Sequence, residues 1–248
     1  MVPAWPYPRW VAHRGAGKLA PENTLAAFRV GASHGYRAFE CDVKLSADGV
    51  PFLLHDETLQ RTTNAHGLAA RFKWSELSRF DAGSWHGRNF AGEPLPSLET
   101  IARYCLGNDF ALNIEIKPTP GSEEETGRVV AGRTLTLWRG AAQAPLLSSF
   151  RPAALAAAML AAPALPRALL LDALNPGWLQ LSRALGCAAV VTAYPLMDLD
   201  VLTQIRDAGM HALVYTVNDP AEVQRLTRLG IDSIITDAVD RFAPAVVP

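Results

Sequence analysis

The alternation of short apolar segments with helical patterns most constrains the fold of this chain. Eight segments predict strands: Trp10–His13, Ala38–Val43, Ala111–Ile116, Leu146–Ser149, Ala168–Leu171, Ala188–Thr192, Ala212–Val217 and Ser233–Thr236. Helical patterns lie between them, most clearly at Thr24–His34, Leu98–Cys105, Gly127–Arg139, Pro152–Ala161, Asp200–Ala208 and Pro220–Leu229. Eight strands alternating with helices over 248 residues predict a (β/α)₈ TIM barrel, with a doubly wound open sheet as the alternative.

Composition narrows the class of protein. Hydrophobic residues make up 49% of the chain and charged residues 19%, which is typical of a soluble globular protein. The length allows one large domain or two small ones, and we expect a single domain over residues 1–248. The net charge of −1 gives no reason to expect a nucleic-acid partner. Three widely spaced cysteines indicate reduced thiols. Because no signal peptide or membrane span is recognisable, we expect a cytoplasmic protein without a stable membrane anchor.

A hairpin and a long insertion interrupt the regular pattern. Asp48-Gly49 lies between apolar stretches and predicts a two-residue turn that pairs residue 43 with 54 and 45 with 52, so that Asp42 faces His55. The following residues, 57–96, hold several aromatic side chains but few strand-like runs. Such a connection is too long for a simple loop. It predicts either a cover over the barrel mouth or a small satellite core without contact to substrate.

Acidic residues end two of the predicted strands. Glu40 and Asp42 are two residues apart on one strand and therefore face the same side, and Glu115 and Lys117 repeat this spacing on another. In a barrel this side can be the interior near the carboxyl ends of the strands, where barrel active sites lie. Three carboxylates favour Mg²⁺ or Ca²⁺ over zinc. Salt bridges to Arg14 or Lys117 are the alternative explanation.

Histidines and cations accompany these carboxylates. His13 ends the first strand and His55 ends the hairpin, and imidazoles exchange protons near neutral pH. Arg14 and Lys117 can neutralise phosphate oxygens. Together with a divalent cation, these residues predict cleavage of a phosphate ester. The other histidines, His34, His66, His86 and His211, receive no role.

The chain resembles glycerophosphodiester phosphodiesterases, and most closely their short cytosolic bacterial form. The resemblance runs from about Trp5 to Asp240 and rests on motifs that occur in the family's order: His13-Arg14-Gly15, Pro21-Glu22-Asn23-Thr24, Glu40-Cys41-Asp42, His55-Asp56, Glu115-Ile116-Lys117, Ser148-Ser149-Phe150, Tyr215-Thr216-Val217-Asn218, and Gly230-Ile231-Asp232 followed by Thr236-Asp237. It implies a TIM barrel of the phosphatidylinositol-specific phospholipase C-like superfamily, with a place in lipid and glycerol metabolism.

The resemblance also implies roles for individual residues. Glu40, Asp42 and Glu115 would bind the metal, His13 and His55 would be the acid–base pair, and Arg14 and Lys117 would contact the phosphate. The substrate pocket would include Phe150 and Tyr215, where the family often has Trp in place of Tyr215. Two further residues have structural interpretations: Asn23 caps the first helix or acts near the metal, and Asp237 caps the last helix.

The expected reaction is metal-dependent hydrolysis of substrates such as glycerophosphocholine or glycerophosphoethanolamine to sn-glycerol 3-phosphate and an alcohol. A cation that bridges a phosphate oxygen and the glycerol 2-hydroxyl would favour a cyclic phosphate, whereas direct attack by water would use the same residues. A lysophospholipase D, a binding-only barrel and an isomerase-type barrel are the alternatives. The sequence leaves open the headgroup, the choice between Mg²⁺ and Ca²⁺, which histidine is the acid, and the oligomeric state.

Overall fold

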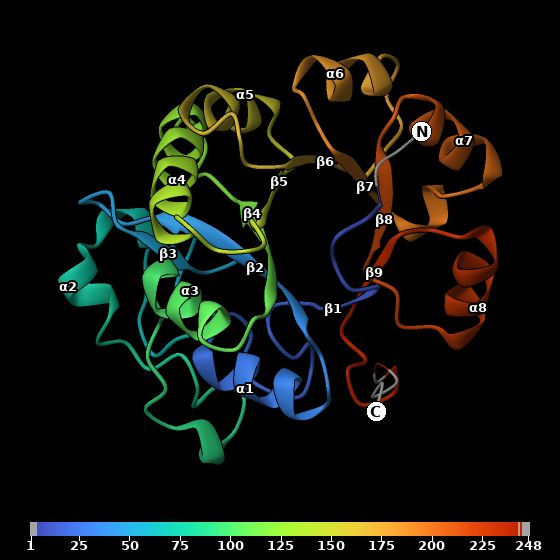
Figure 1. Cartoon of the computed structure of the whole chain (residues 1–248). Helices are drawn as coiled ribbons and strands as arrows, with labels where there is room; N and C mark the ends of the chain where they lie inside the picture. Colours follow the sequence, from blue (N-terminus) through green and yellow to red (C-terminus); the bar gives the residue numbers. More distant parts are fainter. Residues whose placement is uncertain (1–3, 243, 245–248) are drawn as a thin grey trace.

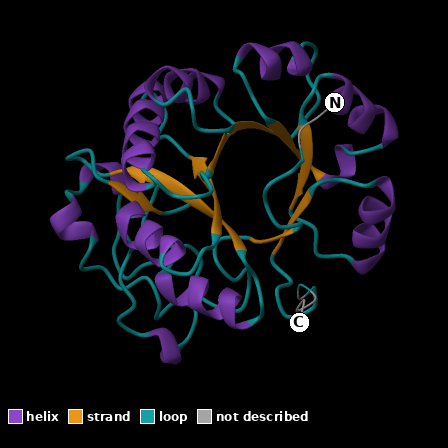
Figure 2. Ribbon diagram, viewed as in Figure 1, coloured by secondary structure: helices purple, strands orange, loops and turns teal. Residues whose placement is uncertain are grey.

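A parallel sheet that closes on itself forms the centre of the protein (Figures 1 and 2). The computed structural model describes residues 4–242 and 244. Around the barrel the strands run β1 (Trp10–Ala12), β9 (Ser233–Thr236), β8 (His211–Tyr215), β7 (Ala189–Ala193), β6 (Arg167–Leu171), β5 (Leu146–Ser149), β4 (Ala111–Ile116) and β2 (Ala38–Leu45). Ala12 pairs with Thr236 on one side and with Phe39 on the other, which closes the ring. The predicted barrel is confirmed, and the open sheet is excluded.

Helices surround the barrel and cover the outer face of its strands (Figure 2). They are α1 (Leu25–Ser33), α3 (Leu98–Leu106), α4 (Glu123–Leu137), α5 (Pro152–Ala161), α6 (Trp178–Ala184), α7 (Leu199–Asp207) and α8 (Pro220–Leu229). The six expected helices are present, but α4 begins four residues before the expected Gly127. Its first turn is Glu123-Glu124-Glu125, and carboxylates in that position are favourable because the helix N-terminus carries a partial positive charge.

Helix α6 was not among the clear sequence predictions. It is only seven residues long and follows Asn175-Pro176-Gly177, a run of turn-forming residues. Gly177 adopts the left-handed conformation that ends this turn, with φ of 85°. A helix of two turns offers too few positions for a hydrophobic period to stand out.

The register of the predicted hairpin is wrong by one residue. Strand β3 (Pro51–Leu53) pairs antiparallel to β2 with Val43 opposite Leu53 and Leu45 opposite Pro51. The loop contains three residues rather than two, because Gly49 at φ +78° adds a left-handed position and the Ser46 hydroxyl caps the turn, accepting from the Val50 amide at 2.9 Å. Asp42 is therefore opposite Leu54, whose amide donates to the Asp42 carbonyl at 3.1 Å, and not opposite His55.

The stretch 57–96 is ordered and has a small core of its own. It contains α2 (Trp74–Leu77) and two short 3₁₀ turns, η1 (Ala69–Arg71) and η2 (Arg88–Phe90). Its buried side chains pack on the hairpin, forming the cluster Phe52, Leu54, Leu59, Ala69, Leu77, Ala82 and Leu95. Figure 1 shows α2 beside β3, outside the ring of strands. The stretch thus has a small core, and its action at the barrel mouth stays a prediction.

Small apolar side chains fill the amino end of the barrel interior. The cluster consists of Val11, Ala38, Ala111, Leu146, Ala168, Leu170, Ala189, Val191, Leu213 and Ile235, and Trp5 and Tyr7 pack against it. The Trp5 indole donates to Ser233 Oγ at 2.8 Å, which holds the N-terminal segment in place. This layer closes one end of the barrel. The polar side chains of the same strands lie toward the other end.

Two glycines of α4 provide a matched test of the helix packing. A Cβ at Gly127 would lie 2.1 Å from the Ala154 carbonyl oxygen of α5, whereas a Cβ at Gly132 would meet nothing within 4 Å. We expect Gly127→Ala to lower the free energy of unfolding by about 1–3 kcal/mol through overpacking. Gly132→Ala should raise it by about 0.5–1 kcal/mol. Urea unfolding measures both values, and equal stabilities of the two variants would contradict this packing.

Candidate active site

Three buried carboxylates meet at the carboxyl ends of β2 and β4. Glu40 and Asp42 project from β2 on one face, and the register of the ladder pairs Asp42 with Glu115 of β4. One carboxylate oxygen from each residue lies within 4.8 Å of the others. Glu40 is 3% exposed, Asp42 1% and Glu115 9%. The strand periodicity that predicted this cluster therefore places its members together.

The electrostatics of this cluster suit a hard divalent cation. Burial and the neighbouring Asp42 charge raise the pKa of Glu40 to about 8 and that of Glu115 to about 7. Although burial opposes it, Arg14 and Lys117 hold the pKa of Asp42 well below its usual range. Glu40 Oε1 is buried and accepts no hydrogen bond. Carboxylates held together in this way, with oxygen atoms left over, are the ligands that Mg²⁺ and Ca²⁺ prefer.

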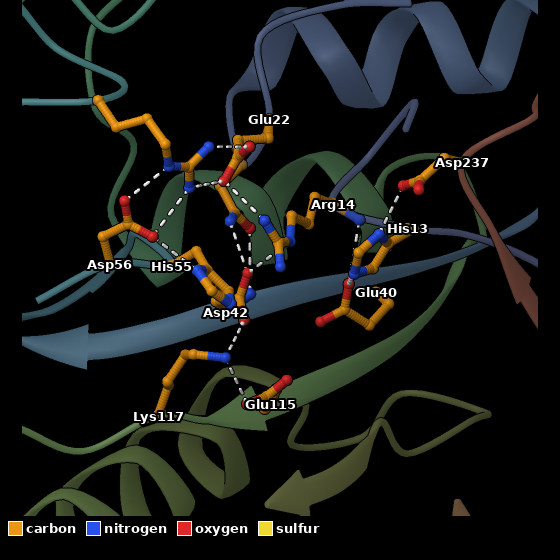
Figure 3. Close-up of polar contacts among 12 residues, drawn as sticks. His13, Arg14, Glu22, Glu40, Asp42, His55, Asp56, Glu115, Lys117 and Asp237 are labelled. Atoms are coloured by element: carbon orange, nitrogen blue, oxygen red, sulfur yellow. Dashed lines mark hydrogen bonds and ion pairs between the residues drawn. The ribbon is translucent and has the colours of Figure 1, made fainter. Parts of the chain in front are cut away.

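Arg14 and Lys117 lie on the cluster, so the expected salt bridges accompany the candidate metal site (Figure 3). The Arg14 amide donates to Glu40 Oε2 at 3.0 Å, and its guanidinium Nε lies 3.2 Å from Asp42 Oδ2. Lys117 Nζ lies 3.2 Å from Asp42 Oδ1 and 2.9 Å from Glu115 Oε1. Arg14 has φ of 50°, a strained conformation for a residue with a side chain. Two cations thus partly neutralise three carboxylates.

Each predicted histidine is hydrogen-bonded to a carboxylate through Nδ1 (Figure 3). His13 Nδ1 lies 2.6 Å from Asp237 Oδ1, and its Nε2 lies 3.8 Å from Glu40 Oε2. His55 Nδ1 lies 2.7 Å from Asp56 Oδ1. In both cases Nε2 is the nitrogen left to face other groups.

The two imidazoles differ in their pKa. For His13, burial lowers the pKa, but the hydrogen bond to Asp237 and the charge of Glu40 outweigh it, so the pKa is raised. For His55, burial is the largest influence and the pKa is lowered. Two titratable groups whose environments separate their pKa values can divide the roles of acid and base.

The prediction that Asp237 caps the last helix is wrong. The last helix, α8, is capped by Asp219, whose side chain accepts from the Ala221 amide at 2.7 Å. Asp237 instead follows β9 and reaches His13, while Asn218 Nδ2 donates to its second oxygen at 3.0 Å. The two elements meet only because β1 pairs with β9, a long-range contact that no local sequence pattern reveals.

Asn23 does not cap the first helix. The cap is Thr24, whose hydroxyl accepts from the Ala27 amide at 3.2 Å. Asn23 is 2% exposed and adopts φ of 59°. Its amide donates to Asp42 Oδ2 at 2.8 Å, and its carbonyl oxygen accepts from the Asp42 backbone amide at 3.0 Å. Of the two roles expected for Asn23, the structure therefore supports the one near the cluster, where it orients Asp42.

Arg61 links the insertion to the site. Its guanidinium donates to Asp56 Oδ2 at 2.6 Å and to Glu22 Oε2 at 2.7 Å. Glu22 in turn accepts from Arg14 Nη1 at 2.9 Å. The chain of contacts runs from the insertion to Asp56 and His55 on one side and to Arg14 on the other. Sequence reasoning missed Arg61, since it lies in a stretch without periodic pattern.

A cavity of about 800 Å³ opens beside these groups. Its lining includes His55, Glu115 and Lys117 together with the aromatic side chains of Phe150 and Trp178. Tyr215 is not among the lining residues, but its ring contacts that of Phe150 edge to face at 5.6 Å. The hydroxyl of Tyr215 donates to the Leu171 carbonyl at 3.2 Å. The hydroxyl group that a Trp at this position would lack is therefore hydrogen-bonded to the backbone.

Comparison with known proteins agrees with this arrangement. Residues 13–241 match the model of the glycerophosphoryl diester phosphodiesterase family. The chain belongs to this family. It is therefore an enzyme of the phosphoric diester hydrolase class, which sets aside the isomerase-type and binding-only barrels. Within the described residues, no helix combines the length and apolar character needed to cross a membrane.

Relatives cover nearly the whole chain. A glycerophosphodiester phosphodiesterase of Caldanaerobacter subterraneus subsp. tengcongensis is 32% identical over 232 residues, 92% of this chain and 93% of that protein. An Oleispira antarctica phosphodiesterase, solved in complex with the product sn-glycerol-3-phosphate, is 32% identical with a TM-score of 0.88 and 95% coverage of both chains. A glycerophosphodiester phosphodiesterase of Agrobacterium tumefaciens is 29% identical with a TM-score of 0.79, covering 95% of this chain and 98% of that one.

Cation binding should stabilise the protein through the carboxylate cluster. We expect millimolar Mg²⁺ or Ca²⁺ to raise the Tm of the wild-type protein by several degrees, because a ligand that binds only the folded state stabilises it. Glu115→Gln should reduce this shift by more than half, since one ligand charge is lost. Thermal melting with and without the cation measures the effect.

The control is Glu125→Gln, which removes an exposed carboxylate of α4 and should leave the shift unchanged. An equal shift in the Glu115→Gln variant, or no shift with any divalent cation, would contradict a metal site at this cluster.

Proposed function

We propose that the protein hydrolyses glycerophosphodiesters such as glycerophosphocholine and glycerophosphoethanolamine to sn-glycerol 3-phosphate and an alcohol, with His13 and His55 as the general acid–base pair. One observation carries the proposal: two imidazoles, each held through Nδ1 by a carboxylate, flank a buried three-carboxylate cluster (Figure 3). The Oleispira phosphodiesterase, in complex with sn-glycerol-3-phosphate, supports this choice of product.

The carboxylate partners set the working nitrogen of each histidine. A hydrogen bond from Nδ1–H to Asp237 or Asp56 leaves Nε2 to accept a proton from the attacking group or to donate one to the leaving alcohol. His13, with its raised pKa, suits the protonated partner, and His55, with its lowered pKa, suits the neutral one. Positioned proton transfer of this kind contributes about 10²–10⁴-fold to a rate.

Arg14 and Lys117 are proposed to bind the phosphate. Both lie beside the carboxylates, and both have donors that a phosphate oxygen can use. Glu22 and Asp42 hold the Arg14 guanidinium in place before substrate arrives. A bound Mg²⁺ or Ca²⁺, with Glu40, Asp42 and Glu115 as its protein ligands, would stabilise negative charge on the phosphate oxygens.

An aromatic wall is proposed for the glycerol moiety. Phe150 lines the cavity, and the Tyr215 ring packs edge to face against it. Because the Tyr215 hydroxyl is bound to the Leu171 carbonyl, the pair offers an apolar surface to the substrate carbons. Loss of rate with a 2-deoxyglycerol analogue would favour a cyclic phosphate route over direct attack by water.

We also propose that residues 57–96 act at the barrel mouth through Arg61 rather than as a detached satellite. Arg61 holds the carboxylate that orients His55 and the carboxylate that orients Arg14. The insertion would thereby fix two functional groups without contacting the phosphate itself.

Release of sn-glycerol 3-phosphate from glycerophosphocholine tests the function directly. We expect turnover that stops with EDTA and returns when Mg²⁺ or Ca²⁺ is restored, because the phosphate charge would otherwise lack its main counter-charge. An enzyme-coupled assay for the product measures the rate. Turnover of lysophosphatidylcholine in preference to glycerophosphocholine would instead indicate a lysophospholipase D.

Removing either histidine should slow turnover while preserving the cluster. We expect His13→Ala and His55→Ala to lower kcat by about 10²–10⁴-fold. The cation-induced rise in Tm should stay close to that of the wild type. Steady-state kinetics and thermal melting provide the two measurements, and near-normal kcat in either variant would remove that histidine from the mechanism.

Two further variants complete this series. His66→Ala changes an exposed histidine of the insertion and should leave kcat unaltered. Arg61→Ala should lower kcat less than His55→Ala and should shift the pH–rate profile, since Asp56 would lose its anchor. An unshifted profile would reduce Arg61 to a structural role.

A further inference from the structure

One lysine at the barrel mouth forms no ion pair with a carboxylate of the described residues. Lys44 lies on β2 two residues beyond Asp42, so its side chain is on the same face and about 6.6 Å nearer the carboxyl end of the strand. It lines the same cavity as His55 and Lys117. The residue is only 2% exposed, although its charge would ordinarily keep it in water.

The neighbours of Lys44 offset its charge only from a distance, through Asp42, Glu57 and Glu115. Lys117 occupies the next position of the β2–β4 ladder, with its amide bonded to the Val43 carbonyl at 2.9 Å. Lys44 Nζ donates to the Lys117 carbonyl at 3.2 Å, which satisfies one of its three donors. Whereas Lys117 Nζ is paired with two carboxylates, Lys44 makes no ion pair within the described part of the chain. Glu57 lines the same cavity and is exposed, and its charge acts on Lys44 without forming an ion pair with it.

Two adjacent cations of which only one is paired with carboxylates repel one another, and a bound anion would offset that repulsion. The diester phosphate already has Arg14 and Lys117 as its proposed partners. Lys44 lies two residues farther along β2 than Asp42 and lines the same cavity, on the side of the site away from Glu40. Arg151, which lines the same cavity from the end of β5, adds a further positive charge to this region.

We propose that Lys44 binds an anionic group carried by the leaving alcohol, a carboxylate or a phosphate, and so selects acidic headgroups. The inference rests on the proposed function, because it assigns the headgroup side of the same site. It makes Lys44 a specificity residue that touches substrate outside the scissile bond.

Two substrates that differ by a single carboxylate test this assignment. Glycerophosphoserine and glycerophosphoethanolamine share the diester and the ammonium group, and only the former has the carboxylate. We compare kcat/KM for both with the wild type, Lys44→Met and Lys44→Arg. Lys73→Met, which removes an exposed lysine of the insertion, controls for net charge. The ratio of the two kcat/KM values is independent of the fraction of protein that is folded.

The wild type should prefer glycerophosphoserine. In Lys44→Met this ratio should fall by about tenfold or more, the scale of one lost charge-assisted hydrogen bond, with little change for glycerophosphoethanolamine. Lys44→Arg should retain much of the preference, and Lys73→Met all of it. Equal losses for both substrates would show that Lys44 serves the diester or the fold, and an unchanged ratio would show no headgroup contact. Either result overturns the inference. A wild type that cleaves neither substrate would overturn the proposed function itself.

Discussion

The repulsion among three buried carboxylates is the constraint on which the site depends. Glu40, Asp42 and Glu115 are brought together by strand register, and burial strengthens their mutual repulsion because water no longer screens it. The surrounding groups offset part of this repulsion. Arg14 and Lys117 supply charge, and Asn23 supplies two hydrogen bonds to Asp42. Burial and the negative charge that they do not offset raise the pKa values of Glu40 and Glu115. This remaining charge makes the cluster a candidate site for a divalent cation.

The barrel provides this arrangement through a division between its two ends. Aliphatic side chains at the amino end pack into an apolar layer, and Trp5 and Tyr7 pack against it. At the carboxyl end the same strands present acids and lysines, and the loops that follow them add His55, Asp56 and Asp237. Charges can accumulate there because a cavity and opposite charges are both within reach. Stability and chemistry are thus assigned to opposite ends of the same strands.

The sequence predicted those features that depend on a repeating pattern within one segment. Alternation along β2 and β4 placed Glu40, Asp42, Glu115 and Lys117 on the interior face, and the succession of strands and helices predicted the closed barrel. It did not predict features that depend on contacts between separate segments. The predicted hairpin register was wrong by one residue because Gly49 allows a three-residue loop. Asp237 was interpreted as a helix cap, and Asn23 either as a cap or as a residue near the metal, because their actual partners lie elsewhere in the fold. Arg61 could not be predicted, since its two acceptors belong to separate loops.

The pairing of His13 with Asp237 joins the beginning of the domain to its end. His13 directly follows β1 and Asp237 directly follows β9, so the 2.6 Å hydrogen bond between them exists only once the ring of strands has closed. During synthesis, a chain that lacks its last strand would hold the carboxylates and both imidazoles, yet His13 would have no fixed orientation. If His13 acts in the proposed acid–base pair, hydrolysis would become possible only when the final strand docks.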